Sequence, residues 1–242
     1  MEAEALQASA ETLFPSLAND AKVPDALWPS DNALGIPVLD PLMQANALDL
    51  PVSTWGAMGR TKLTRHAATV LFYTEDYRFE GLWAKPRTVL NGRVVNAGEP
   101  NFSVGPQTPV AQAVWNTYRK RWLARYWQEC GLRIFVDLFV DETFGALNLV
   151  GVPAGWRAYC DRGHTDSVDQ LDHDLAVAHA HAGCRPLFVV YGGGKTVLAW
   201  ARYHAEDGVL WVPESTDVAQ GRAIATEGQL LLEGLVNRGA TE

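Results

Sequence analysis

The sequence predicts an α/β fold of repeated βα units, with about six mainly parallel strands. Three observations lead there. From residue 67 onward, runs rich in β-branched and aromatic residues alternate with segments of helical spacing. The 242 residues, 48% hydrophobic and 20% charged, have the composition of an ordinary globular domain. PLFVVYGGG at 186–194 has the pattern of a buried strand followed by a glycine turn. Such units form either an incomplete barrel or an open doubly wound sheet, and the pattern does not separate the two.

The first 60 residues differ in composition from the rest of the chain. Prolines recur there among short apolar runs, a pattern typical of extended segments and turns. We therefore predict a Pro-rich N-terminal arm packed on the core over residues 1–60, and a single α/β domain over residues 61–242 with a closing C-terminal helix.

The predicted elements follow one another in βα order. Strands are predicted at 67–76, 93–103, 132–140, 155–164, 186–194 and 208–213. Helices are predicted at 79–83, 108–129, 167–182, 196–204 and 217–237. The segment 145–153 is either a short strand or an irregular crossing.

Charge and cysteine content limit the classes of function. The formal net charge is -8, so the average surface repels phosphates, and a nucleic-acid site has to be a local patch. The three cysteines contain no C-x-x-C and indicate free thiols in a reducing compartment. There is no basic, apolar N-terminal signal and no long apolar stretch, which predicts a cytoplasmic protein of a bacterial host and no membrane partner.

Polar residues follow several of the predicted strands. In parallel βα folds, ligands bind at the carboxyl ends of the strands. This rule selects Asn101, Asp141, His164 and Lys195 as residues that converge on one cleft. Asn101 is expected to orient a polar ligand, Asp141 to act as a base or bind a metal ion, His164 to move a proton, and Lys195 to hold an anion.

The helix predicted at 108–129 carries an aromatic stripe. At 100° per residue, Trp115, Tyr118, Trp122 and Tyr126 fall within about 80° of one another. Two interpretations stay open: the stripe packs on the sheet, or its rings and the neighbouring Arg119 bind bases and phosphates. In the second case Tyr118 and Arg119 reach the edge of the cleft.

Familiar catalytic and metal motifs are absent. YGGGKT at 191–196 resembles a phosphate-binding turn, but Val189 stands where a P-loop requires glycine. His179 and His181 point to opposite faces of a helix, which disfavours a zinc site. We therefore predict no particular metal or cofactor from the sequence, and the question whether the protein is an enzyme stays open.

Several short motifs together resemble a known family of bacteriophages and plasmids. They are Thr61-Lys62-Leu63, TEDYRFEGLW at 74–83, Asn101-Phe102-Ser103, Trp115-Asn116-Thr117-Tyr118-Arg119, Tyr126-Trp127, Gly151-Val152-Pro153 and Tyr191-Gly192. Their order and spacing resemble the family catalogued as domain of unknown function 4417. The resemblance implies a mobile-element origin and no particular activity. The family usually has aspartate where this chain has Asn101, which implies that any catalytic role of that aspartate is missing here.

Two hypotheses about function follow. In the first, a mobile-element protein binds nucleotide or nucleic acid in the strand-end cleft and acts on the nucleobase or the phosphate. In the alternative, a non-catalytic interaction protein binds a host or phage protein through the N-terminal arm and the aromatic surface.

Overall fold

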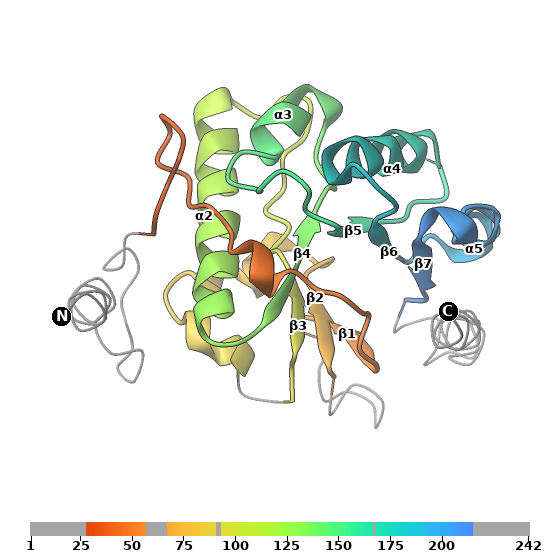
Figure 1. The fold of residues 1–242 in the computed structure, drawn as a ribbon, viewed down its shortest axis with the longest axis horizontal. Helices are drawn as coiled ribbons and strands as arrows, with labels where there is room; N and C mark the ends of the chain where they lie inside the picture. The colour runs from red at the N-terminus through yellow and green to blue at the C-terminus, as the bar shows by residue number, and fades with distance from the viewer. Residues whose placement is uncertain (1–27, 57–66, 91–92, 167, 215–242) are drawn as a thin grey trace.

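The computed structural model describes residues 28–56, 67–90, 93–166 and 168–214. Within these ranges seven strands form one parallel sheet in chain order (Figure 1). They are β1 (Val52–Thr54), β2 (Thr69–Leu71), β3 (Asn96–Gly98), β4 (Arg133–Asp137), β5 (Ala158–Arg162), β6 (Leu187–Tyr191) and β7 (Val209–Val212). The α-helices are α2 (Val110–Glu129), α3 (Gly145–Asn148), α4 (Val168–Ala182) and α5 (Gly194–Tyr203). The predicted α/β fold of parallel βα units is confirmed.

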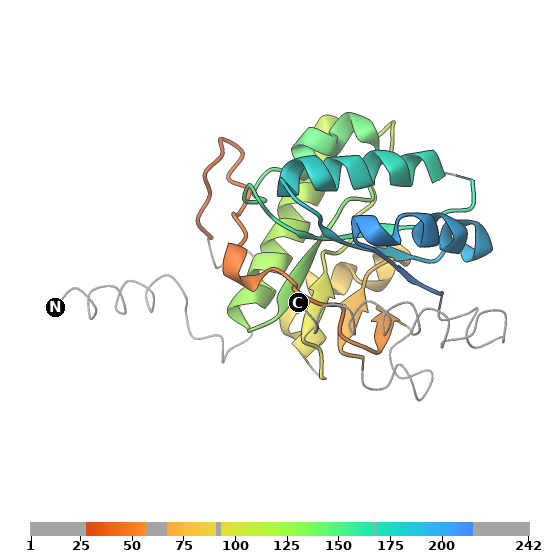
Figure 2. The same cartoon turned by 45° about the vertical axis from the view of Figure 1, so that its right-hand side comes forward.

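The strand order distinguishes between the two predicted architectures. Each strand pairs in parallel with the next one in the chain, and the order never reverses. Helices α2, α4 and α5 lie on one face of the sheet (Figures 1 and 2). Most of their buried apolar side chains belong to a single core cluster. A doubly wound sheet has helices on both faces. Over the described residues the fold is therefore the incomplete barrel, with seven strands and with its helices on the outer face.

The inner face of the half-barrel has its own apolar cluster. Strand side chains alternate, so Phe135 of β4 and Val189 of β6 point inward, while Ile134 and Val190 point to the helices. Cys160 of β5 is among the inward residues. The middle of this face is apolar. Polar inward side chains lie at both ends of the strands, and Thr69 and Asn96 are buried at the amino ends of β2 and β3.

Helix α2 is the largest element on the outer face. Trp122 and Tyr126 are fully buried, with their rings 5.5 Å apart and nearly parallel. Trp28 closes over them, 5.9 Å from the ring of Trp122. By contrast, Trp115 is 44% exposed and stacks on Tyr118 at 5.9 Å. The C-terminal half of the aromatic stripe is thus core, and its N-terminal half lies at the surface.

The segment before the sheet contributes to the core. Ile36 and Leu39 are buried, and Gln44 forms a parallel bridge with Ile134 of β4. Residues 52–54, expected in the arm, form β1 and pair with β2. The sheet therefore begins before residue 67, where the sequence predicted its first strand.

Other predicted elements differ in detail. The segment 145–153 contains the short helix α3 followed by turns rather than a strand. The region near Phe79–Trp83 consists of the 3-10 turns η3 (Asp76–Arg78) and η4 (Glu80–Leu82). The predicted closing helix at 217–237 lies outside the described residues. In the described ranges, no helix has both the length and the apolar character needed to cross a membrane.

Candidate functional site

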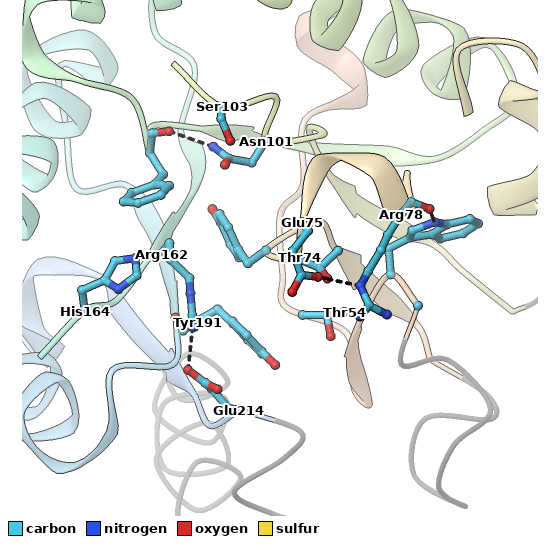
Figure 3. A pocket seen from close by; sticks show the side chains of 14 residues that line it. Thr54, Thr74, Glu75, Arg78, Asn101, Ser103, Arg162, His164, Tyr191 and Glu214 are labelled. Atoms are coloured by element: carbon cyan, nitrogen blue, oxygen red, sulfur yellow. Dashed lines mark hydrogen bonds and ion pairs between the residues drawn. The ribbon is translucent and has the colours of Figure 1, made fainter. Parts of the chain in front are cut away.

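A cavity of about 510 Å³ lies at the carboxyl ends of the strands. Each strand, or the segment directly after it, contributes to its wall, and Figure 3 shows the side chains that line it. The lining residues are Thr54, Trp55, Gly56, Tyr73, Thr74, Glu75, Arg78, Asn101, Ser103, Phe139, Arg162, His164, Tyr191 and Glu214. In barrel-like βα folds this end of the sheet is where ligands bind, because the strand-to-helix loops there vary without disturbing the core.

Aromatic rings form the floor of the cavity. Tyr73, following β2, and Tyr191, at the end of β6, lie 6.0 Å apart with an interplanar angle of 19°. Phe139 stands edge-on to Tyr73 at 6.5 Å. His164 lies 5.3 Å from Phe139 at the rim. Such flat, rigid rings favour a planar ligand that stacks on them.

Arg162 and Glu214 form an ion pair on one side of the cavity (Figure 3). Nη2 of Arg162 lies 2.6 Å from Oε1 of Glu214, and its Nη1 donates to the carbonyl oxygen of Tyr191 at 3.0 Å. The guanidinium also lies 5.2 Å from the centre of the Tyr191 ring. This arrangement fixes a donor and an acceptor side by side at the ends of β5 and β7.

A second ion pair stands on the side formed by β1 and β2. Nε of Arg78 lies 2.5 Å from Oε2 of Glu75, which also accepts a hydrogen bond from Thr74 at 2.9 Å. The pKa of Glu75 is lowered, first by its own backbone amide and then by Thr74 and Arg78. The carbonyl oxygen of Arg78 accepts from Nε1 of Trp55 at 2.9 Å, which ties this pair to the end of β1.

Asn101 is a buried amide whose orientation is fixed by its neighbours. Its Nδ2 donates to Oδ2 of Asp137 at 2.9 Å and to the carbonyl oxygen of Phe139 at 2.7 Å. Because both partners are acceptors, the amide nitrogen faces them and Oδ1 is left on the cavity side (Figure 3). Oδ1 therefore offers the cavity an acceptor whose position is set in advance.

Asp137 lies directly beneath the cavity and is fully buried. Nζ of Lys120, from α2, approaches its Oδ2 at 3.2 Å, and the hydroxyl of Tyr73 donates to its Oδ1 at 3.1 Å. Burial, followed by the negative charges of Cys160 and Asp137 in their ionised forms, raises the pKa of Tyr73 well above its usual value. Tyr73 therefore remains a neutral donor, and its ring is held against the floor of the cavity.

A second buried ion pair extends this network to the outer face. Nη1 of Arg121 contacts Oε1 of Glu99, and the backbone amide of Asp137 donates to Oε2 of Glu99 at 3.2 Å. Arg121 also donates to the carbonyl oxygens of Asn148 and Val150. These bonds join α2 to the ends of β3 and β4, so the cavity rests on a fixed polar scaffold.

His164 is an ionisable residue at the rim whose pKa is shifted by its surroundings. Partial burial and then the charge of Arg162 lower its pKa below the usual value of 6.5, against smaller opposing effects of Glu214 and Asp166. At neutral pH the imidazole is therefore mainly uncharged, with one nitrogen able to donate and the other to accept.

Among the residues selected from the sequence, Asn101 and His164 both line the cavity. Asp141, Tyr118, Arg119 and Lys195 lie outside its lining. Asp141 caps η6 (Glu142–Phe144), where its Oδ1 accepts from the backbone amide of Thr143 at 3.1 Å.

Arg119 and Tyr118 face a different surface. The guanidinium of Arg119 lies 3.7 Å above the ring of Phe102 and 3.6 Å from Oε1 of Glu80. Burial raises the pKa of Tyr118, whose ring packs against Trp83 at 6.2 Å. Both side chains belong to an aromatic surface cluster on the N-terminal half of α2.

The glycine turn has a packing role that the sequence did not reveal. Gly192 has φ +82°, and a Cβ there would lie 1.9 Å from Nη1 of Arg162 and 2.8 Å from Oε1 of Glu214. Glycine is thus required for the ion pair to pack against the turn. Lys195, the second residue of α5, is exposed and is not among the residues that line the cavity.

Sequence reasoning missed most of the remaining lining residues. Among the lining residues that it did not select are Glu75, Arg162, Tyr191 and Glu214. Their position at the last residue of a strand, or just after it, was the available signal. In the described part of the chain, no group of three or more His, Cys, Asp and Glu residues is arranged to hold a metal ion.

Comparisons with known proteins give a family and two relatives. A family model described as "Domain of unknown function (DUF4417)" matches residues 28–155. The Gene 1 protein of Mycobacterium phage D29 is 35% identical over 111 residues, which cover 44% of this chain and 40% of the phage protein. The Gene 1 protein of Mycobacterium phage L5 is 36% identical over 78 residues, covering 31% and 34%. The matched segments thus span less than half the length of either relative. No solved structure matches.

Proposed function

This chain belongs to the DUF4417 family of unknown function, and two of its relatives are encoded by mycobacteriophages. From this premise we propose that it binds nucleotide or nucleic acid through a nucleobase held in the strand-end cavity. The observation that carries the proposal is the aromatic floor formed by Tyr73, Phe139 and Tyr191. A base stacked on an aromatic ring gains about 1–3 kcal/mol.

The polar groups around the floor suit the edges of a base. Asn101 presents Oδ1 as an acceptor, and the Arg162–Glu214 pair presents a donor beside an acceptor. Nucleobases carry donors and acceptors in the plane of the ring, so stacking and edge contacts are made together. The volume of about 510 Å³ lies in the range of small-molecule sites.

His164 supports a chemical role at the rim. Because its pKa is lowered, the neutral imidazole predominates at neutral pH and is able to accept or donate a proton. We assign ligand contact to Asn101 and proton transfer to His164. Asp141 and Lys195 are not part of this assignment, since they lie outside the cavity lining.

Isothermal titration of the full chain with nucleosides, nucleotides and short oligonucleotides tests the proposal. Tyr191→Leu removes the ring from the floor and keeps an apolar side chain, so we expect about a tenfold or greater loss of affinity. Tyr203→Leu is the matched control, because Tyr203 is 84% exposed on α5 and outside the cavity lining. Equal affinities of the two variants would contradict the proposal.

A second candidate function is supported by the aromatic surface on α2. Trp115 is 44% exposed and packs with Trp83 and Tyr118. Tryptophan is enriched at protein interfaces relative to the rest of the surface. This cluster favours the alternative, binding of a host or phage protein. An absence of heat with every nucleobase ligand would favour it over the first proposal.

A further inference from the structure

We propose that the cavity selects an unphosphorylated ligand, a free nucleobase or nucleoside, over the corresponding nucleotide. This inference rests on the nucleobase recognition of the proposed function, and it names free bases and nucleosides as the favoured ligands in place of nucleotides. It is drawn from the way the charges of the cavity are paired.

The cationic side chains of the cavity are already neutralised. Arg162 is paired with Glu214 at 2.6 Å, and Arg78 with Glu75 at 2.5 Å. With His164 neutral, the described residues of the lining carry a formal charge of zero. A phosphate group carries about -1.5 to -2 charges at neutral pH. A bound phosphate would lie close to a carboxylate beside each guanidinium. Its repulsion by the carboxylate would oppose its attraction to the guanidinium.

The other candidate cations are held away from the cavity. Lys120 is buried against Asp137, and Arg119 lies over Phe102 near Glu80. Lys195 is exposed and outside the lining. Among the residues that the structure describes, none of the cations in the lining lacks a carboxylate partner.

The first amide of the glycine turn is also unavailable to a phosphate group. The backbone amide of Gly192 donates to the carbonyl oxygen of Val212 at 2.8 Å, so it continues the sheet ladder. The carbonyl oxygen of Gly192 accepts from Nε1 of Trp211 at 2.8 Å. A phosphate-binding turn needs several amides that point at the ligand. Here the first of them is already used within the sheet.

What the cavity does offer matches a neutral planar ring. Each ion pair presents donors and acceptors with no net charge, and Oδ1 of Asn101 adds a fixed acceptor. The rings of Tyr73 and Tyr191 provide the stacking surface. A nucleobase satisfies all of these groups through its edges and faces, and a ribose adds only neutral hydroxyls.

The test is calorimetric titration of the full chain with the four ribonucleosides, their bases, their 5′-monophosphates and their 5′-triphosphates at about 150 mM salt. We expect at least one base or nucleoside to bind about tenfold or more tightly than its triphosphate. Its affinity should change little with salt concentration, because no net charge is neutralised on binding.

Glu214→Gln provides the specificity test. It removes the carboxylate charge and leaves the positive charge of Arg162 facing the cavity, so the ratio of monophosphate to nucleoside affinity should rise about tenfold. Glu75→Gln makes the same change at the pair of Arg78 and Glu75. It replaces Glu214→Gln in the test if that variant does not fold. Glu206→Gln is the matched control, because Glu206 is an exposed glutamate of η7 (Ala205–Asp207) outside the lining.

The outcomes separate this inference from the proposed function. Tighter binding of monophosphates or triphosphates than of nucleosides would overturn the inference and leave nucleobase binding standing. An unchanged affinity ratio in both glutamine variants would overturn the argument from charge pairing. No binding of any compound in the set, nor of short oligonucleotides, would overturn the proposed function and this inference together.

Discussion

Nδ2 of Asn101 donates a 2.9 Å hydrogen bond to Oδ2 of Asp137, a fully buried carboxylate that Lys120 of α2 also approaches at 3.2 Å. Asn101, a residue of the cavity wall, is thus held in place by the buried carboxylate of Asp137. The position of Asn101 Oδ1 in the cavity therefore depends on the same network that joins α2 to β4.

Asn101→Ala should weaken both ligand binding and the fold. The change removes two hydrogen bonds and leaves the carbonyl oxygen of Phe139 without this donor. A loss of about 1–3 kcal/mol in the free energy of unfolding follows. Urea denaturation measures it, and titration with the best nucleobase ligand should show a parallel loss of affinity.

The control for that variant is Ser103→Ala. Ser103 also lines the cavity, but it is exposed and bonds to Asp76 at the surface. Its stability should change by about 0.5 kcal/mol or less. If Asn101→Ala is as stable as Ser103→Ala, the amide does not depend on the interior network.

Asp137→Ala should be among the most damaging substitutions in the chain. It leaves Lys120, which is 2% exposed, without its carboxylate. Removing one partner of a buried ion pair costs about 3–5 kcal/mol. Glu129→Ala is the comparison, because it breaks the pair of Arg125 and Glu129 at the surface of α2, the helix that also carries Lys120. There we expect a loss of about 0–1 kcal/mol in the free energy of unfolding. Chemical denaturation of both variants gives the comparison, and similar losses would contradict the assigned burial.

The main elements of the fold follow directly from local patterns. The periodicity of residues 108–129 predicted a helix close to the observed α2, and the apolar run at 186–194 contained β6. β1 was missed because it has only three residues, Val52–Thr54, and its pairing with β2 is a tertiary contact. The choice between barrel and doubly wound sheet required the strand order, which no local pattern encodes.

Only part of the site was predicted, because the sequence shows which residues follow a strand but not which distant side chains they meet. The strand-end rule found Asn101 and His164, because their place after a strand can be read from the chain. It did not identify the Arg162–Glu214 pair, which joins residues 52 positions apart. Asp141 satisfies the rule too, yet its side chain turns back to cap η6. Position at a strand end therefore selects candidates, and side-chain partners decide among them.

Asp174→Asn should change how stability depends on pH. Burial raises the pKa of Asp174 to about 6, and burial together with the charge of Asp174 raises that of Asp161 well above its usual value. The folded state therefore binds protons more strongly than the unfolded state. This contribution is present below about pH 4 and is lost as pH rises through about 6.

Urea denaturation at several pH values measures this effect. The wild-type free energy of unfolding should fall by an amount on the order of 1–3 kcal/mol between about pH 4 and 7 relative to Asp174→Asn. Asp169→Asn is the control, because Asp169 is exposed in the first turn of the same helix. Parallel pH profiles of the wild type and Asp174→Asn would show that the carboxyl group is not perturbed.

Gly192→Ala should disrupt the cavity through one contact. Its Cβ would lie 1.9 Å from Nη1 of Arg162, so the guanidinium has to move away from Glu214. Gly194→Ala is a close control, because Gly194 also has a positive φ, of +61°, but open space around its Cβ. Both variants bear the backbone strain of about 1–2 kcal/mol that a left-handed alanine brings. Only Gly192→Ala should additionally lose ligand affinity in calorimetry. Equal affinities of the two alanine variants would show that the Arg162–Glu214 pair does not contact the ligand.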